Sequence, residues 1–412
     1  MGSPAGLRRE KALAYFCILV CLALAALVVM RTGLRSGATS SSYAALAEAF
    51  LHGRLWIEKC PEIDCAVHNG RTFIIFPPLP AIVMMPLAAV FGAGVAAKAQ
   101  MAMVLVFMLL ALWLWCRIFQ ALNVSRESVN WLLAAIAFAS PAFYIAFKGD
   151  GVWFFAQSLG FLMMTAALAS VIVWRSLALA GLFVALAFLC RQMSIFYPLF
   201  LAALALPEQG RWSEALRRYP WKQFIVAGLF VAASLAVIFT YNYARFGAPL
   251  ETGYRYIQNP GVDSYINNRQ IAGLLFSVKF FLSNFYYMFL QGFHMHFGGP
   301  LGNQPLGMDV FGTSIIAASP WLVLAFYMRF DRVAIAGLAT IAIIAGVTLF
   351  YQSNGFEQVH TQRYALDWLP VAFVLLARSV KPQAQNALPL LVTFAATMNL
   401  IAILSSMAFG VK

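Results

Sequence analysis

The sequence of 412 residues contains very little charge, since aspartate, glutamate, lysine and arginine together make up only 10% of it. Acidic residues are the scarcest group: 15 of them stand against 28 lysines and arginines, which gives a formal net charge of +13. Hydrophobic residues make up 62% of the chain, more than a soluble protein of this size can bury. The composition therefore excludes the soluble classes and predicts an all-α polytopic membrane protein.

Several motifs that carry known chemistry are also missing. The sequence has no Walker loop, dinucleotide-binding fingerprint, Ser-x-x-Lys or His-Glu-x-x-His motif, which excludes direct ATP hydrolysis and the standard hydrolase sites. It has no basic tail or RNA-binding motif, and its basic residues are spread along the chain. We therefore expect anionic lipid or an anionic substrate as partners, and no nucleic acid.

Long apolar runs predict about eleven spanning helices in a single transmembrane domain that covers residues 1–412. With the N-terminus inside, the arginines and lysines of the short links fall on the cytoplasmic side, as the positive-inside rule requires. No Ala-x-Ala cleavage site follows the first run, so we interpret that run as an uncleaved anchor. The predicted spans are 12–30, 96–116, 131–147, 153–174, 176–190, 193–206, 223–244, 310–328, 333–351, 365–378 and 388–409.

The apolar segment 73–91 is not expected to cross the membrane. It contains four prolines, and crossing would move the basic cluster in 211–222 to the outer side, against the positive-inside rule. We therefore expect a short interfacial helix inside a first outer loop, 31–95. A second outer loop, 245–309, contains an aromatic stretch at 273–293 that predicts an amphipathic interfacial helix.

The first outer loop holds three acidic candidates for catalysis, Glu58, Glu62 and Asp64. We favour Asp64 as a general base that takes a proton from an acceptor hydroxyl, while a solvated loop acid is the alternative. Cys60 and Cys65 flank this turn and form either a disulfide, in an oxidising compartment, or two free thiols. A disulfide would hold Asp64 rigidly. A zinc site at these two cysteines lacks nearby partners.

Arg191 lies inside an otherwise apolar hairpin, where an arginine is expensive unless it faces a polar cavity. Its planar guanidinium group is suited to binding a lipid phosphate through two hydrogen bonds. The alternative is that the long side chain extends to the membrane interface and places its charge in water. His360, Arg363 and Asp367 are spaced to share one helical face, which forms either a site wall or, for Arg363 and Asp367, a structural ion pair. The remaining candidates for substrate binding are Lys148, Asp150, Gln192, Gln362, Glu251, Tyr254 and Arg255, with Arg245 as a further phosphate ligand.

His294 and His296 alternate along the chain, as metal ligands often do. Two histidines are too few for a site without further ligands, and the sequence does not identify a third. No metal site is therefore predicted from these residues.

Four segments resemble bacterial integral-membrane glycosyltransferases of the GT-C class, in the superfamily of PMT-like and ArnT-like enzymes. In chain order these segments are SYAALAEAFLHGRL continued by EIDCAVHNGRTFIIFPPLPAIVMMPLAAVFG, ALAFLCRQ, NYARFGAPLETGY and GFEQVHTQRYALDWLP. The resemblance implies a many-helix fold, a catalytic carboxylate in the first outer loop and a donor sugar linked to polyprenyl phosphate. It matches Asp64 to that carboxylate and Arg191 to the hairpin arginine, and it matches Arg363 and Asp367 to the last motif. Many relatives carry an acid just before Tyr43, and this sequence has none.

The sequence therefore predicts an inverting glycosyltransferase of the bacterial inner membrane with its active site on the periplasmic side. It would move a monosaccharide from a polyprenyl-phosphate donor to a glycolipid, lipopolysaccharide or other acceptor. Arg191, with Arg363 or Arg245, would hold the phosphate, so no cofactor is required and a divalent metal is optional. The alternatives are a transporter or lipid flippase, which would show pseudo-symmetric halves, and an O-antigen ligase or polymerase, which would use a diphosphate-linked glycan.

Overall fold

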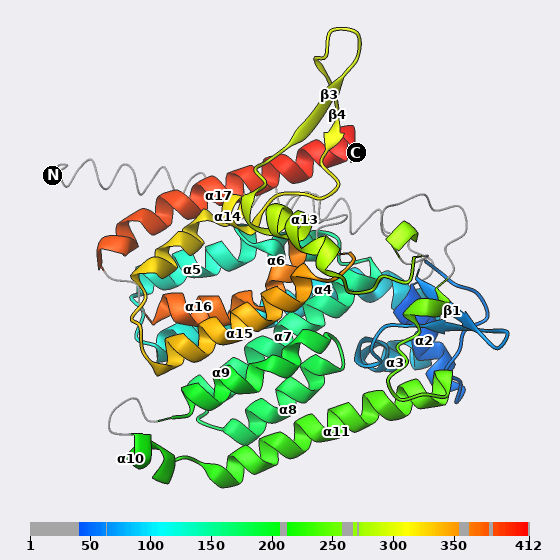
Figure 1. The fold of residues 1–412 in the computed structure, drawn as a ribbon, viewed down its shortest axis with the longest axis horizontal. Coiled ribbons are helices and arrows are strands. Elements are labelled where there is room, and N and C mark those ends of the chain that lie inside the picture. The colour runs from blue at the N-terminus through cyan, green and yellow to red at the C-terminus, as the bar shows by residue number, and fades with distance from the viewer. Residues whose placement is uncertain are drawn as a thin grey trace. The chain divides into compact units, whose positions relative to one another are not determined.

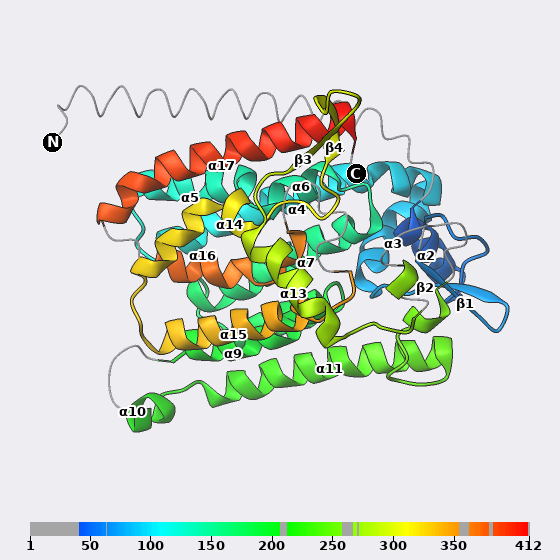
Figure 2. The same cartoon turned by 45° about the horizontal axis from the view of Figure 1, so that its top comes forward.

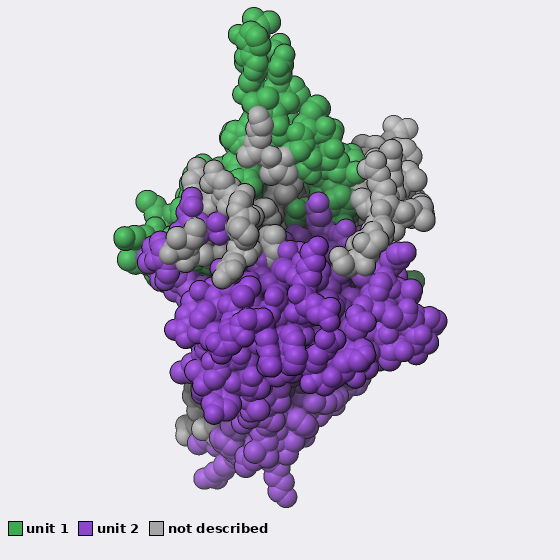
Figure 3. All heavy atoms as spheres, turned by 90° about the vertical axis from the view of Figure 1, so that its right-hand side faces the viewer, with its two compact units in different colours: residues 1–35, 115–147, 278–412 green, residues 36–114, 148–277 purple. Residues whose placement is uncertain are grey.

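The computed structural model describes residues 41–62, 64–206, 212–257, 267–269, 272–353, 362–378 and 382–410 (Figure 1 and Figure 2). The chain divides into two compact units (Figure 3). Unit 1 comprises residues 1–35, 115–147 and 278–412, and unit 2 comprises residues 36–114 and 148–277.

Helices dominate both units, because a helix satisfies its own backbone hydrogen bonds where no water is present. Among the described residues, five helices are long and apolar enough to cross a membrane. They are α4 (Ala93–Ala121), α7 (Val152–Ile172), α11 (Trp221–Phe246), α15 (Arg332–Leu349) and the part of α17 (Pro382–Phe409) from Ala387 onward. The pair α5 (Arg126–Phe138) and α6 (Pro141–Phe147), bent by 51°, makes a sixth if it is one span. The fold is therefore an all-α polytopic membrane fold.

Unit 2 packs around α7, which is almost completely buried, whereas α11 is largely exposed. Exposed aliphatic side chains on a spanning helix are expected to face lipid rather than water. Gly181 lets α11 approach α8 closely, since a Cβ there would lie 2.3 Å from the Cα of Ala227. The other elements of unit 2 are α2 (Ser42–Leu51), α3 (Leu79–Phe91), α8 (Leu177–Phe188), η1 (Gln192–Phe196), α9 (Tyr197–Leu204), α10 (Trp212–Arg217) and η2 (Tyr254–Tyr256), with β1 (Cys65–His68) and β2 (Arg71–Ile74).

The strands β1 and β2 form an antiparallel hairpin in which Cys65 pairs with Ile74. Its two-residue turn is Asn69-Gly70, and both residues have positive φ, of 49° and 71°. Asn-Gly is the preferred sequence for such a turn, because both residues tolerate this conformation. Around the hairpin, a small core forms from Ala66, Phe73, Ile75 and Phe246.

In unit 1, polar side chains satisfy the backbone at the break between α5 and α6. Ser319 Oγ and Trp321 Nε1 both donate to the carbonyl of Ala139, at 2.7 and 2.8 Å. Asn399 of α17 donates to the carbonyl of Phe138 at 3.3 Å. The other elements of unit 1 are η3 (Val278–Phe280), α13 (Phe281–Phe285), η4 (Tyr286–Leu290), β3 (Met295–Gly298), β4 (Gln304–Met308), α14 (Ile315–Ala318), η5 (Pro320–Tyr327), η6 (Arg363–Asp367) and α16 (Leu369–Ala377).

Four of the predicted spans are shorter in the structure, in addition to segment 131–147, which forms the bent pair α5–α6. Segments 176–190 and 193–206 contain the 12-residue helix α8 and the eight-residue helix α9, which are too short to be counted as spans. Segment 310–328 contains only the short helices α14 and η5, because Pro320 supplies no amide hydrogen to continue α14. Segment 365–378 contains the nine-residue helix α16. The predicted anchor 12–30 lies outside the described residues.

The two predicted interfacial segments are helical in part. The segment 73–91 ends in α3, whose 13 residues extend about 20 Å and are too few to span a membrane. Within the aromatic stretch 273–293, residues 278–290 are helical.

Candidate functional site

The acidic turn of the first loop is closed by a disulfide between Cys60 and Cys65, with the two Cα atoms 6.0 Å apart. Asp64 directly precedes β1 and has a φ of +64°, a left-handed conformation that aspartate adopts more readily than most residues. Its side chain is half-buried. The next residue, Cys65, is both one half of the disulfide and the first residue of β1. The backbone of Asp64 is therefore anchored on its C-terminal side.

Glu62 lies in the same turn and connects the first turns of two helices. Its Oε1 accepts a hydrogen bond from the amide of Ser42, at 2.9 Å, and its Oε2 accepts one from the amide of Val152, at 3.3 Å. These amides belong to the N-termini of α2 and α7, which attract negative charge. Burial nevertheless raises the pKa of Glu62, the two backbone hydrogen bonds oppose this rise, and the nearby charge of Asp150 adds to it. Glu62 is therefore a carboxyl group with an increased affinity for a proton.

The predicted outer turn at Lys148 and Asp150 lies beside Glu62. Gln100 Nε2 fixes this turn by donating to the carbonyls of Gly149, at 3.2 Å, and Asp150, at 2.8 Å. The side chains of Lys148 and Asp150 are exposed. The structure thus brings Asp150 together with Glu62, 88 positions apart in the sequence.

Glu58 is the most solvated of the three acidic candidates. Its side chain is 86% exposed and forms an ion pair with Arg54 at 3.3 Å. Exposed ion pairs of this kind contribute about 0–1 kcal/mol to stability. This is the geometry of a solvated loop acid.

Tyr43 follows the first residue of α2 and is completely buried. Its ring packs against Phe155, with the ring centroids 5.9 Å apart, and its hydroxyl has no hydrogen-bond partner among the described residues. Burial raises the pKa of Tyr43, the nearby Cys190 adds to the rise, and the positive charge of Arg191 opposes it. Tyr43 thus lies against α7 at Phe155.

Arg191 is the N-cap residue directly before η1, in the short connection between α8 and α9. Its aliphatic stem lies on α7 at Gly160, where a Cβ would come within 2.8 Å of Arg191 Cγ. Arg191 is half-buried, and with Tyr43 it completes a group of charged and polar side chains along the first half of α7. We call Glu62, Asp64, Asp150, Tyr43 and Arg191 the loop cluster. Gln192, the next residue in the chain, has an exposed side chain.

Arg245 is buried, and its guanidinium forms hydrogen bonds with other residues of the protein. Nη1 donates to the carbonyl of Ile74 at 2.6 Å, and Nη2 donates to Asn242 Oδ1 at 2.8 Å. The guanidinium carbon also lies 3.7 Å from the ring centre of Tyr241. These contacts join the end of α11 to β2, so the geometry favours a structural role for Arg245 over phosphate binding.

The residues after α11 form a small network of their own. Glu251 Oε2 pairs with Arg255 Nε at 2.6 Å, and Glu251 Oε1 accepts from the amide of Gly253 at 2.8 Å. Tyr254 packs against the core of the β1–β2 hairpin. The structure therefore brings these three predicted substrate residues to the hairpin that follows Asp64.

The late motif belongs to unit 1, and His360 lies outside the described residues. Gln362 Nε2 donates to the carbonyl of Phe311 at 3.0 Å, and both Arg363 and Asp367 are buried. They lie in η6, a 3-10 helix with three residues per turn, so the α-helical face predicted from their spacing does not form.

Sequence reasoning missed Tyr43 as a member of the site. The resemblance mentioned Tyr43 only as the residue after the position where many relatives carry an acid, and in the sequence it directly follows a run of three serines. A buried hydroxyl without a partner becomes visible only once the fold is known.

No protein-family model matches the sequence, and no curated protein matches it significantly. Among solved structures, the chain is similar to ArnT from Cupriavidus metallidurans bound to undecaprenyl phosphate, with 16% identity, a TM-score of 0.46, and coverage of 87% of this chain and 59% of that chain. It is also similar to the archaeal oligosaccharyltransferase AglB from Archaeoglobus fulgidus in complex with an inhibitory peptide and a dolichol-phosphate, with 14% identity, a TM-score of 0.45, and coverage of 98% and 56%. The chain thus spans somewhat more than half the length of either structure. At these scores the similarity assigns no residue a role.

Proposed function

We propose that the chain is a membrane glycosyltransferase that moves a monosaccharide from a polyprenyl-phosphate donor to a glycolipid, lipopolysaccharide or other acceptor. The resemblance of its four sequence segments to GT-C enzymes motivates the proposal. The observation that carries it is the loop cluster, in which a disulfide-closed acidic turn lies at the start of α7 with a buried tyrosine and an arginine.

Asp64 is the proposed general base. It is half-buried in the disulfide-closed turn and directly precedes β1, so its backbone is held in place, whereas Glu58 is solvated. Asp64 takes the proton of the acceptor hydroxyl as that oxygen attacks the anomeric carbon. The bond between the anomeric carbon and the phosphate oxygen breaks at the same time, and the phosphate leaves with the electron pair. The configuration at the anomeric carbon is inverted.

Arg191 is the proposed ligand of the donor phosphate. A half-buried guanidinium binds phosphate more strongly than an exposed one, because less water competes and its fork matches two phosphate oxygens. It stabilises the charge that builds up on the leaving group. The hydroxyl of Tyr43, which has no hydrogen-bond partner among the described residues, is the proposed hydrogen-bond donor to the same phosphate. Arg363 remains a second candidate by resemblance alone. We further propose a bacterial inner-membrane location with the loop cluster on the periplasmic side, as the basic links predict.

The test uses the full-length protein in lipid nanodiscs with a panel of polyprenyl-phosphate monosaccharides and a glycolipid or lipopolysaccharide acceptor, and it measures release of polyprenyl phosphate. Asp64→Asn should reduce turnover by at least a hundredfold while donor binding is retained. Glu58→Gln, an acid of the same loop, is the matched control and should retain the wild-type rate. Wild-type turnover in Asp64→Asn would exclude this base. Turnover only with diphosphate-linked glycans would favour the ligase or polymerase alternative.

A further inference from the structure

A second group of polar side chains lies in unit 1, at the base of the β3–β4 hairpin. These strands pair antiparallel, with Met295 opposite Met308 and His296 opposite Gly307. The amide of Asp309 donates to the carbonyl of His294 at 3.1 Å, which extends the pairing to the residues just outside the strands. The hairpin extends away from the helices of its unit (Figure 1).

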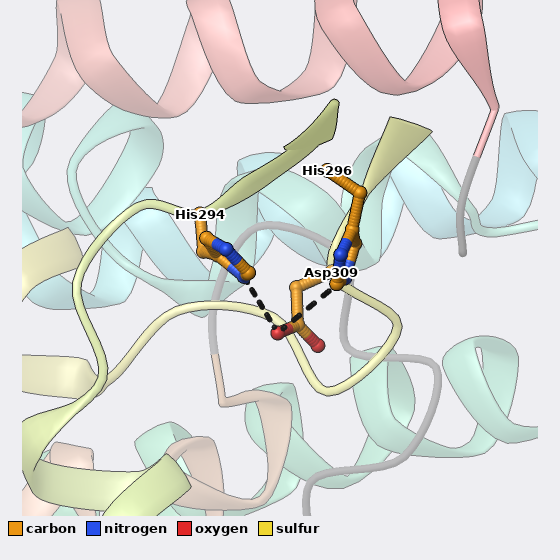
Figure 4. Close-up of side chains that lie close together, drawn as sticks. All are labelled: His294, His296 and Asp309. Atoms are coloured by element: carbon orange, nitrogen blue, oxygen red, sulfur yellow. Dashed lines mark hydrogen bonds and ion pairs between the residues drawn. The ribbon is translucent and has the colours of Figure 1, made fainter. Parts of the chain in front are cut away.

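Three potential metal ligands meet at this base: His294, His296 and Asp309. The Asp309 Oδ2 atom lies 3.1 Å from His294 Nδ1 and 3.9 Å from His296 Nε2. One donor atom from each residue lies within 4.8 Å of the others, and both imidazole rings are directed at the same carboxylate (Figure 4). Residues two apart in an extended segment point to the same side, which explains why both histidines reach it.

The carboxylate is held in place by its own neighbours. Its Oδ1 accepts a hydrogen bond from the amide of Phe311 at 2.8 Å, so Oδ2 is the oxygen that faces the histidines. Gln291 Nε2 is 3.4 Å from Oδ2. The Asp309 side chain is only 10% exposed, whereas the two imidazoles are 49% and 39% exposed. Such supporting hydrogen bonds are typical of metal-binding carboxylates.

The spacing of the three donor atoms matches a small divalent cation. Zinc binds imidazole nitrogen and carboxylate oxygen at about 2.0–2.2 Å, which separates neighbouring ligands of a tetrahedron by roughly 3.3 Å. The separations of 3.1 and 3.9 Å from Asp309 Oδ2, with all three donor atoms within 4.8 Å of one another, lie close to this value. Magnesium and calcium prefer sites made of oxygen alone, so two imidazoles disfavour them.

We propose that His294, His296 and Asp309 bind one first-row divalent cation, zinc being the best match, at the base of the β3–β4 hairpin. The ion joins the residue before β3 to the residue after β4 and so fixes the two ends of the hairpin. Three protein ligands leave a fourth position, and the exposure of the imidazoles opens it to water. The sequence offered only the two histidines, because the third ligand follows 13 positions later. This site does not depend on the proposed transferase activity.

The experiment uses full-length protein without a polyhistidine tag, treated with a chelator and then titrated with zinc by calorimetry. One zinc ion per chain is expected to bind. Cobalt as a spectroscopic substitute should give the visible absorption bands of a site with nitrogen and oxygen ligands. His296→Ala and Asp309→Asn should each weaken binding by more than tenfold. Asparagine in place of Asp309 can still accept the hydrogen bond from Phe311, so it preserves the turn.

His52→Ala is the matched control, since His52 is an exposed histidine of unit 2 at the end of α2. It should leave zinc affinity unchanged, and the melting temperature of each metal-free variant should equal that of the metal-free parent. Absence of equimolar binding, or equal affinity in the three variants and the parent, would overturn the proposal. Because the readout is binding, failure of the transferase assay would leave this result unaffected.

Discussion

The carboxylate of Glu62 accepts a hydrogen bond from the backbone amide of Val152 at 3.3 Å, across 90 positions of sequence. With the second hydrogen bond, from Ser42, it attaches the first outer loop to the N-termini of α2 and α7. The position of Asp64, two residues later and beside the disulfide, therefore depends on how firmly Glu62 is held.

Glu62 is expected to make the protein less stable as the pH rises. Burial raises the pKa of Glu62 above its value in the unfolded chain, about 4.3, so the folded protein binds this proton more tightly. The unfolded state then holds fewer protons than the folded state, and stability declines with pH from the unfolded pKa up to the folded pKa.

The measurement is the apparent melting temperature of the parent and of Glu62→Gln between pH 4 and pH 8. The parent should lose stability relative to the variant as the pH increases, and the difference should level off above the folded pKa. Glu58→Gln serves as the control, because this side chain is 86% exposed. A difference between the parent and Glu62→Gln that stays constant, or that grows in favour of the parent, would contradict the assigned direction.

Gly160→Ala should impair donor binding by displacing Arg191. A Cβ at this position would lie 2.8 Å from Arg191 Cγ, too close for the present side-chain position, and the arginine stem is flexible enough to move. We expect at least a tenfold increase in the Kd of the polyprenyl-phosphate donor, with the fold retained. The control is Gly228→Ala in α11, where a Cβ meets nothing within 4 Å. Equal donor affinity in both variants would show that Arg191 does not contribute to donor binding.

Tyr43→Phe should reduce turnover without reducing stability. The hydroxyl has no hydrogen-bond partner among the described residues, so its removal costs the folded state nothing and relieves a buried polar group. A hydrogen bond from it to a charged phosphate contributes about 1.5–3 kcal/mol, which corresponds to a loss of roughly ten- to hundredfold in kcat/KM.

Tyr219→Phe provides the matched control for this comparison. Tyr219 also has a buried hydroxyl with no partner in the part of the chain that the structure describes, and it lies between α10 and α11, outside the loop cluster. Its removal should leave both kcat/KM and the melting temperature unchanged. If both tyrosine variants keep full activity, the hydroxyl of Tyr43 takes no part in donor binding.

The sequence predicts the helices far better than the site, for a physical reason. An apolar run such as that of α7 forms a helix because its own backbone requires it, so local composition is sufficient. The break at Pro320 was also encoded locally, by the missing amide, but an apolar run on both sides concealed it. The turn at Asn69-Gly70 was a recognisable hairpin signal, yet no strands were predicted in the first outer loop.

The partners of the site residues could not be read in the same way. Val152 donates to Glu62 through its backbone, which every residue possesses, so no side-chain pattern indicates the contact. Asp309 became a potential metal ligand only because strand pairing returns it to His294. The sequence suggested Arg245 only as a phosphate ligand. Its contact with Ile74 was hidden, because Nη1 donates at 2.6 Å to a backbone carbonyl 171 positions away.

Arg245 and Arg191 should respond oppositely to substitution by lysine. Arg245 makes two hydrogen bonds in a buried position and stacks on Tyr241, and a single ammonium group cannot reproduce this planar arrangement. Arg245→Lys is therefore expected to destabilise the protein by about 2–3 kcal/mol, seen as a lower melting temperature. The Kd for donor should remain within about twofold at temperatures where the variant is folded. Arg191→Lys should show the reverse, with an unchanged melting temperature and a donor Kd raised by tenfold or more, because a point charge replaces a bidentate fork. If Arg191→Lys lowers the melting temperature and leaves donor affinity unaltered, Arg191 has a structural role and is not the phosphate ligand.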